Sequence, residues 1–195
     1  MSTMSRIQAV VVIALVCLFT LTANAQIGSG WTRYSPSVTL QVRGCGAASG
    51  MTFRLTCAAT SGDNRAELRY GDITSAQNQF QGTVVVNSLT GDRISLKQVH
   101  PLTGGWVMVA VKKPGVLYSV HDGSTLSSYT IGTPVRINTI TNTKTRTCQV
   151  YINGSLRTTL TNGVPPLYDK VGVYRTSTGK GPVSATWSNI AFWRK

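Results

Sequence analysis

Acidic residues are scarce in this sequence, where six Asp and Glu stand against 19 Lys and Arg in 195 residues. So few carboxylates argue against a calcium cage, which needs several oxygen ligands. The sequence also has only two histidines and no Cys-x-x-Cys pair, so a structural zinc site is not expected. We therefore expect no metal and no cofactor.

Long apolar runs are absent after residue 26. The single such run, "IQAVVVIALVCLFTLT", follows one positive charge at Arg6 and precedes Ala-Asn-Ala at 23–25. A membrane anchor is the alternative, but the run is short for a bilayer span and the small residues favour cleavage. We predict a signal peptide at 1–25 and a single exported domain at 26–195, secreted and free of the membrane after cleavage.

Cysteines are also few. Cys17 lies in the predicted signal peptide, which leaves Cys45, Cys57 and Cys148. Cys45 and Cys57 are 12 residues apart, a separation that suits a hairpin, and export permits oxidation. We predict that these two form a disulfide and that Cys148 is a buried thiol. Asn153-Gly154-Ser155 is an N-glycosylation acceptor, if the host glycosylates.

The charge balance indicates the kind of partner. Removal of Arg6 with the signal peptide leaves 18 basic and six acidic residues, a formal net charge of +12. Such a field attracts polyanions, whereas solubility alone does not need so one-sided a balance. For an exported monomer we expect an anionic polysaccharide or an anionic cell surface as the partner. A nucleic-acid partner would suit an intracellular protein better, so none is expected.

Helical patterns are nearly absent, and short strand-like runs recur about every ten residues between turn signals. This spacing favours an all-β protein, a β-jelly roll or concanavalin-like sandwich of two antiparallel sheets with a concave substrate cleft. Asn153-Gly154 is the strongest hairpin signal in the chain. The expected strands are 37–42, 51–57, 66–70, 80–87, 93–100, 106–112, 116–121, 134–140, 147–153, 170–176 and 184–193.

One strand carries charges on alternate positions. In "RAELRY" the side chains of Arg65, Glu67 and Arg69 point to one face, because residues two apart in a strand share a face. The flanking cations favour the ionised form of Glu67, whose expected role is to hold both arginines. The simpler interpretation is a solvated face with a weak surface ion pair.

Two further strands carry polar faces. In "LKQVH", Leu96, Gln98 and His100 share a face, and in "YDKVGVY" a glycine lies between Lys170 and Tyr174 on the face that also carries Tyr168. A glycine inside a strand often marks the close approach of a ligand or of another backbone. Alone, each pattern also fits a structural histidine or an edge strand. Together the three faces predict one site. His121, at a turn, is read as a surface residue.

These residues carry a resemblance to a known family. "RAELR" resembles the R-(S/T/N)-E-L-R motif of the polysaccharide lyase family 7 alginate lyases, "QVH" resembles their Q-(I/V)-H motif, and "YDKVGVY" is similar to their Y-F-K-A-G-x-Y motif. The motifs occur in the family's order across roughly 110 residues. The resemblance implies a β-jelly roll and endo-acting cleavage of a uronate polymer by β-elimination.

The resemblance also implies roles for individual residues. Arg65, Gln98, His100 and Tyr174 match the family's catalytic residues. Those that match substrate-binding or supporting residues are Glu67, Arg69 and Lys170. Arginine and amide donors suit the uronate carboxylate, histidine suits a general base, and a tyrosine hydroxyl can protonate the leaving oxygen. Whether His100 or Tyr174 is the base stays open, because the two uronate epimers present the C5 proton on opposite faces.

The third motif departs from the family. Asp169 and Val171 replace the usual Phe and Ala, and Arg-Thr follows Tyr174 where Asn-Gln is usual. By strand alternation Asp169 and Val171 face away from the site, whereas the loss of Asn-Gln puts the substrate in question. A glucuronan lyase on the same fold is therefore an alternative to an alginate lyase. A non-catalytic carbohydrate-binding module and a charge-driven surface or nucleic-acid binder are alternatives of other classes.

Overall fold

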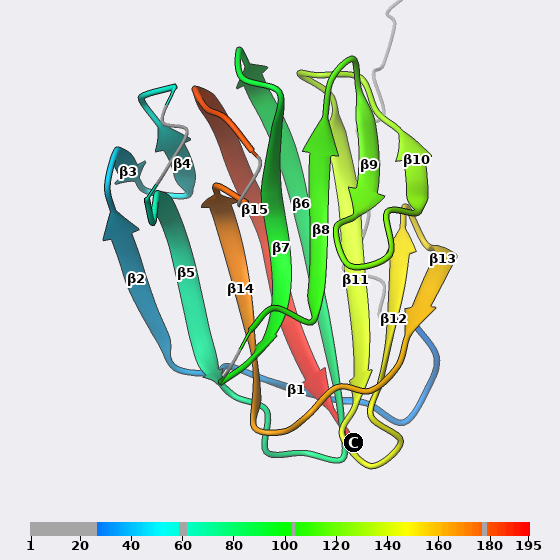
Figure 1. Cartoon of the computed structure of the whole chain (residues 1–195). Coiled ribbons are helices and arrows are strands. Elements are labelled where there is room, and N and C mark those ends of the chain that lie inside the picture. The colour runs from blue at the N-terminus through cyan, green and yellow to red at the C-terminus, as the bar shows by residue number, and fades with distance from the viewer. Residues whose placement is uncertain (1–26, 59–61, 103, 177–178) are drawn as a thin grey trace, which may run out of the picture.

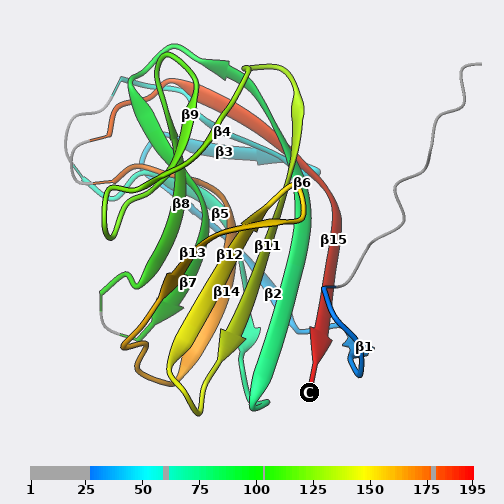
Figure 2. The ribbon, with the colours of Figure 1, turned by 90° about the vertical axis from the view of Figure 1, so that its right-hand side faces the viewer.

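A computed structural model describes residues 27–58, 62–102, 104–176 and 179–195, and all regular structure in these ranges is β-strand. The predicted signal peptide lies outside the described residues. The strands form two antiparallel sheets packed face to face (Figures 1 and 2). In these ranges no helix is long and apolar enough to cross a membrane.

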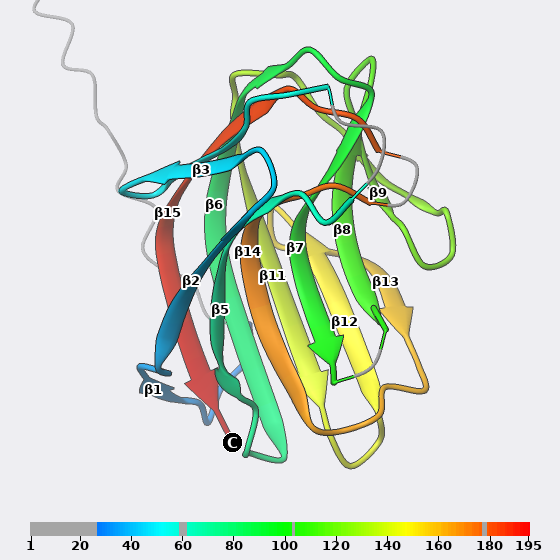
Figure 3. The ribbon, with the colours of Figure 1, turned by 60° about the vertical axis from the view of Figure 1, so that its left-hand side comes forward.

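The seven-stranded sheet lies at the front of Figure 1. Its strands, in spatial order, are β10 (Thr125–Ser128), β9 (Val116–Ser119), β8 (Val107–Lys112), β7 (Arg93–Pro101), β14 (Leu167–Tyr174), β5 (Arg65–Asp72) and β2 (Val38–Arg43). The strand β2 forms one edge (Figure 3).

The eight-stranded sheet lies behind it. Its strands, in spatial order, are β13 (Ser155–Leu160), β12 (Thr147–Ile152), β11 (Pro134–Asn142), β6 (Gln77–Leu89), β15 (Val183–Arg194), β4 (Thr52–Leu55) and β3 (Gly46–Ser49), with β1 (Thr32–Tyr34) paired to β15. The predicted all-β jelly-roll sandwich of two antiparallel sheets is confirmed. Neither sheet closes into a barrel.

The core lies between the sheets and is filled by alternate residues of their strands. Phe80 of β6 and Trp187 of β15 are fully buried or nearly so, and their rings pack edge to face with centroids 6.1 Å apart. Burial of such aromatic side chains is a dominant favourable contribution to folding. The disulfide Cys45–Cys57 and the buried free thiol of Cys148 are as predicted.

Every strand predicted from the sequence is present, with ends that differ by a few residues. The hairpin at Asn153-Gly154 is also confirmed, since both residues have the positive φ angles (52° and 85°) that a tight two-residue turn requires. β1, β3 and β10 were not predicted from the sequence. All three are only three or four residues long, and β3 and β10 also contain Gly, Ala or Ser, which have low β-propensity.

The central strand β14 pairs with β5 on one side and with β7 on the other. Lys170 is the partner of Arg69 on β5 and of Gln98 on β7. Tyr174 is opposite Arg65, and Tyr168 is opposite His100. This register brings together three segments that are far apart in the sequence, because antiparallel partners share a face of the sheet.

Gly172 permits the close approach of β14 to β5. Its φ is +144°, and a Cβ atom there would overlap the carbonyl oxygen of Ala66 and lie 2.7 Å from Cα of Glu67. The pairing with β7 is irregular at the same place, between Val171 and Tyr174. Only glycine adopts such backbone angles readily, so the local backbone geometry depends on this residue.

A buried ion pair lies on the core side of the same strands. Lys97 of β7 and Asp169 of β14 are almost fully buried, with Nζ and Oδ1 2.5 Å apart. Asn78 Nδ2 donates to Asp169 Oδ2 at 2.9 Å, and Tyr34 Oη donates to Asn78 Oδ1 at 2.5 Å, so the network connects the two sheets. As predicted, Asp169 and Val171 point away from the candidate site.

One predicted orientation is wrong. Strict alternation places Leu96 on the face of Gln98 and His100, but Leu96 is 1% exposed and belongs to the hydrophobic core. The pairing of β7 with β8 shifts between Ser95 and Lys97, which marks a bulge. A bulge inserts one extra residue and reverses the alternation beyond it. Ser95, opposite Tyr174, takes the outward position instead.

We predict that Lys97→Met alone destabilises the protein by roughly 3–5 kcal/mol, because it leaves the Asp169 carboxylate buried without its cation. The double variant Lys97→Met with Asp169→Leu should recover much of this loss, since no buried charge then remains unpaired. Urea unfolding measures both values, and Lys144→Met on the surface is the control. A double variant no more stable than the single one would contradict this account.

We predict that Gly172→Ala destabilises the protein more than Gly132→Ala does. Both glycines have positive φ, 144° and 89°, but nothing lies within 4 Å of a Cβ at Gly132. Gly132→Ala should therefore destabilise the protein only through backbone strain, by roughly 1–2 kcal/mol. Gly172→Ala should add the overlap with the β5 backbone to this strain. Equal losses in urea unfolding would show that the β5–β14 approach does not require glycine.

Candidate functional site

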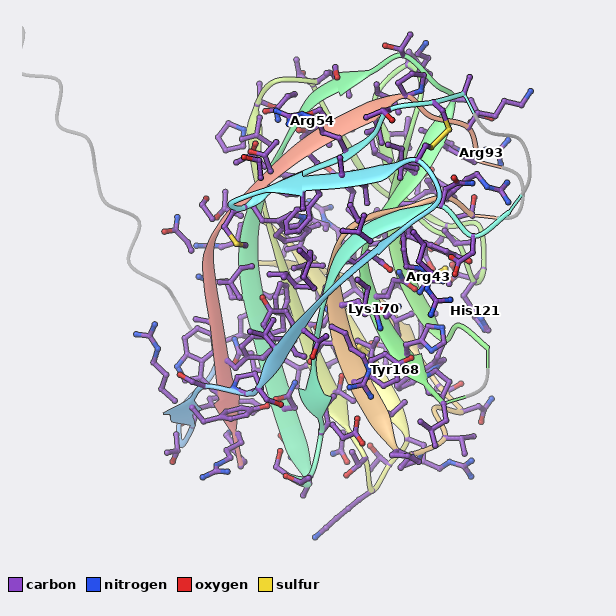
Figure 4. All side chains as sticks on the ribbon, turned by 90° about the vertical axis from the view of Figure 1, so that its left-hand side faces the viewer. Arg43, Arg54, Arg93, His121, Tyr168 and Lys170 are labelled. Atoms are coloured by element: carbon purple, nitrogen blue, oxygen red, sulfur yellow. A yellow bond between two sulfur atoms is a disulfide. The ribbon has the colours of Figure 1, made fainter. Side chains whose placement is uncertain are left out.

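The seven side chains predicted for the site lie on three neighbouring strands, β5, β14 and β7. We call the face of the seven-stranded sheet that points away from the core the outer face. The register places Arg65, Glu67 and Arg69 beside Tyr174, Gly172 and Lys170, with Gln98 and His100 on the far side of β14. Tyr168 and Lys170 project to the same side in Figure 4. The structure thus brings together all seven: Arg65, Glu67, Arg69, Gln98, His100, Lys170 and Tyr174.

Glu67 lies at the centre of this group. Its side chain is 1% exposed, and its two oxygens accept hydrogen bonds from Gln98 Nε2 and from Lys170 Nζ, the latter at 3.3 Å. Gln98 and Glu67 are on opposite sides of β14, where Gln98 is the register partner of Lys170 and Glu67 is that of Gly172. The carboxylate therefore connects three strands on the outer face.

Burial changes the electrostatics of this centre. The pKa of the Glu67 carboxyl is raised because burial disfavours the charged form, and the nearby cations Lys170 and Arg65 oppose the rise. The pKa of Lys170 is lowered, also mainly by burial, with Glu67 opposing. The neighbouring cations do favour ionisation of Glu67, as expected from the sequence, but burial has the larger effect.

Arg65 is held mainly by a residue that the sequence analysis did not select. Asp63 Oδ1 accepts from Nε at 2.7 Å and lies 2.5 Å from a terminal nitrogen, whereas Glu67 Oε2 is 3.7 Å from Arg65. The Arg65 guanidinium also lies 4.9 Å from the ring centroid of Tyr174. Arg65 thus places a cation in contact with that tyrosine.

The expected contact between Glu67 and Arg69 is replaced by another. Arg69 pairs with Asp72 at 2.8 Å, and its guanidinium lies 4.0 Å from the ring centroid of Tyr168. The prediction that Glu67 holds both arginines is therefore wrong for Arg69. Glu67 bonds instead to Gln98 and Lys170, which the sequence could not show because those partners lie on other strands.

His100 lies half-buried at the end of β7. Its Nδ1 is 2.5 Å from the carbonyl oxygen of Pro101 and 3.1 Å from Tyr168 Oη. Burial lowers the pKa of the imidazole, and the cations Lys170, Arg65 and Arg69 lower it further, against the Pro101 contact. The ring is therefore neutral near pH 7, as a general base must be.

Four residues missed as site residues complete the arrangement. Asp63 and Asp72 pair with the arginines, and Tyr168 contacts both His100 and Arg69. Ser95, 1% exposed, lies opposite Tyr174, and its hydroxyl has no hydrogen-bond partner in the described part of the chain. Strand alternation in the sequence had already placed Tyr168 on the face of the site. Its contacts with His100 and Arg69 became known only from the structure.

A pocket of about 390 Å³ begins next to this group, at the residue that follows His100. Its lining residues are Pro101, Leu102, Gly105, Trp106, His121, Asn162, Val164, Pro165 and Pro166. His121 is exposed, as predicted.

Among the described residues no group of three or more His, Cys, Asp or Glu is placed to hold a metal ion.

The arrangement places three chemical functions on one face of the sheet, Arg65 beside Tyr174 and His100 beside Tyr168. Arg65 is a cation with donors for a carboxylate, His100 is a neutral imidazole, and Tyr174 carries a hydroxyl. All three are partly exposed, while the residues between them, Glu67 and Lys170, are buried. The partly exposed Arg65, His100 and Tyr174 therefore lie around two buried charged residues, Glu67 and Lys170.

No family model matches the sequence, and no curated protein does. Solved structures match the fold. The alginate lyase from Corynebacterium sp. has a TM-score of 0.61 and 18% identity, over 78% of this chain and 79% of that one. The marine family 7 alginate lyase AlyA1 from Zobellia galactanivorans has a TM-score of 0.57 and 19% identity, over 72% of this chain and 76% of that one. The alginate lyase AlyC3 in complex with dimannuronate has a TM-score of 0.55 and 9% identity, over 72% of this chain and 73% of that one. At these identities the likeness concerns the fold.

Proposed function

We propose that this protein is an exported polysaccharide lyase that cleaves an acidic polyuronate by β-elimination. The observation that carries the proposal is the placement of Arg65, a neutral His100 and Tyr174 on the same face of three neighbouring strands. The fold likeness to alginate lyases supports it, and one of those proteins is described in complex with dimannuronate. The excess of 19 basic over six acidic residues suits a polyanionic substrate.

The reaction removes the proton on C5 of a uronate and expels the glycosidic oxygen on C4. Electrons of the C5–H bond form the C4–C5 double bond, and the C4–O bond breaks. Negative charge develops on the neighbouring carboxylate during this step, so a preorganised cationic donor there accelerates it. Arg65 is the partly exposed donor, and Gln98, whose amide is already bonded to Glu67, borders the same position.

Two residues are suited to the proton transfers. Nδ1 of His100 contacts a carbonyl oxygen, which only accepts, so Nδ1 carries the hydrogen and Nε2 is the basic nitrogen. Nε2 would take the C5 proton, and the Tyr174 hydroxyl would protonate the leaving oxygen. Where the C5 proton lies on the leaving-group side, Tyr174 would serve as both base and acid, and His100, protonated at Nε2 as well, would bind the carboxylate.

Alginate is the first substrate to test, and glucuronan is the alternative. We predict that the purified mature chain produces ultraviolet absorbance from unsaturated uronate ends on at least one of alginate, polyguluronate, polymannuronate and glucuronan. The four polymers also report the epimer preference. Absence of signal on all four, from protein shown to be folded, would overturn the proposal. Binding without double-bond formation would instead indicate a carbohydrate-binding module.

We predict that Tyr174→Phe lowers kcat by at least roughly 100-fold, a size typical of the loss of a general acid. Binding of the polymer should change little, because Phe keeps the ring beside Arg65. Initial rates give kcat, and a polymer-binding assay gives the affinity. Tyr151→Phe on β12, in the other sheet, is the control. Wild-type activity in Tyr174→Phe would remove this tyrosine from the mechanism.

A further inference from the structure

Tyr168 lies between the two flanking strands of the site and contacts a residue from each. Its ring stacks on His100 of β7, with centroids 5.3 Å apart and planes at 22°. The guanidinium of Arg69, on β5, lies 4.0 Å from the Tyr168 centroid. Because β5 and β7 lie on opposite sides of β14, Arg69, Tyr168 and His100 form a three-layer stack across the outer face.

The hydrogen bonds of His100 fix which nitrogen carries the proton. Pro101 O, 2.5 Å from Nδ1, has no hydrogen to donate, so a neutral His100 has its hydrogen on Nδ1. Tyr168 Oη, 3.1 Å from the same nitrogen, then accepts from that N–H, and its own hydrogen is free to point elsewhere. Nε2 keeps its lone pair.

The charged groups around the ring act in the same direction. Lys170 comes from β14, and Arg65 and Arg69 come from β5; all three disfavour a second proton on His100. Tyr168 is the neutral group between His100 and Arg69. It is 9% exposed and covers one face of the imidazole, so it limits the access of water to the ring.

We propose that Tyr168 is a positioning residue for His100, which holds the imidazole in the Nδ1–H tautomer with Nε2 directed away from the sheet. The assignment of Nε2 as the acceptor of the C5 proton rests on the proposed function. The positioning itself does not, because it concerns contacts within the free protein. Loss of a residue that orients a functional histidine typically lowers activity by about 10–100-fold.

The first measurement is the tautomer of His100 in the free full-length chain, from ¹⁵N–¹H correlation spectra of protein labelled at histidine. His100→Gln identifies the signal, because only two histidines are present. Wild type should be the Nδ1–H tautomer at neutral pH. Tyr168→Leu should give a mixture of tautomers, whereas Tyr168→Phe, which keeps the stack, should keep the Nδ1–H form. A wild-type protein in the Nε2–H form would overturn the proposal even if no variant folds.

The second measurement is the rate on the polymer that the substrate panel identifies. Tyr168→Leu should lower kcat by about 10–100-fold with little change in KM, and its pH–rate profile should move, because the exposed ring gains protons more easily. Tyr151→Leu, a half-buried tyrosine of the other sheet, is the matched control. An unchanged tautomer and pH profile in Tyr168→Leu would refute the positioning role. If none of the four polymers is cleaved but the His100 tautomer changes in Tyr168→Leu, only the proposed function would be refuted.

Discussion

The hydrogen bonds that Glu67 accepts from Gln98 and Lys170 tie three strands together on the outer face of the seven-stranded sheet. Gly172 of β14 is the register partner of Glu67, and its lack of a side chain lets the backbones of β14 and β5 approach closely at this point. The remaining groups of the site surround this centre. Arg65 and Tyr174 lie at one end, and His100 with Tyr168 lies at the other.

Charge is placed unevenly in this chain. Three of the six acidic residues, Asp63, Glu67 and Asp72, lie on or directly before β5, and each pairs with a cation of the site. Asp169 lies behind them and pairs with Lys97 in the core. The carboxylates of a very basic protein are thus used where cations must be held in fixed positions.

The two faces of β14 have different polar networks, and the alternation of the strand separates them. Lys170 faces outward to Glu67, and Asp169 faces inward to Lys97, Asn78 and Tyr34. Both networks depend on one register between β14 and β7. A slip by one residue would place Asp169 outside and Lys170 inside, each without its partner, so the buried charges favour a single alignment.

The sequence by itself determined the all-β class, the positions of the longer strands and the face on which each site residue lies, because these follow from period-two alternation and turn chemistry. The disulfide was predictable from the short separation of Cys45 and Cys57 and the expected export. Tertiary structure decided which strands are neighbours. Pairing between residues 68 or more positions apart has no local signature, so only the structure joined Glu67 to Lys170, and Tyr168 to His100 and Arg69. It also decided that burial outweighs the flanking cations in setting the pKa of Glu67, since burial depends on what surrounds a side chain in space.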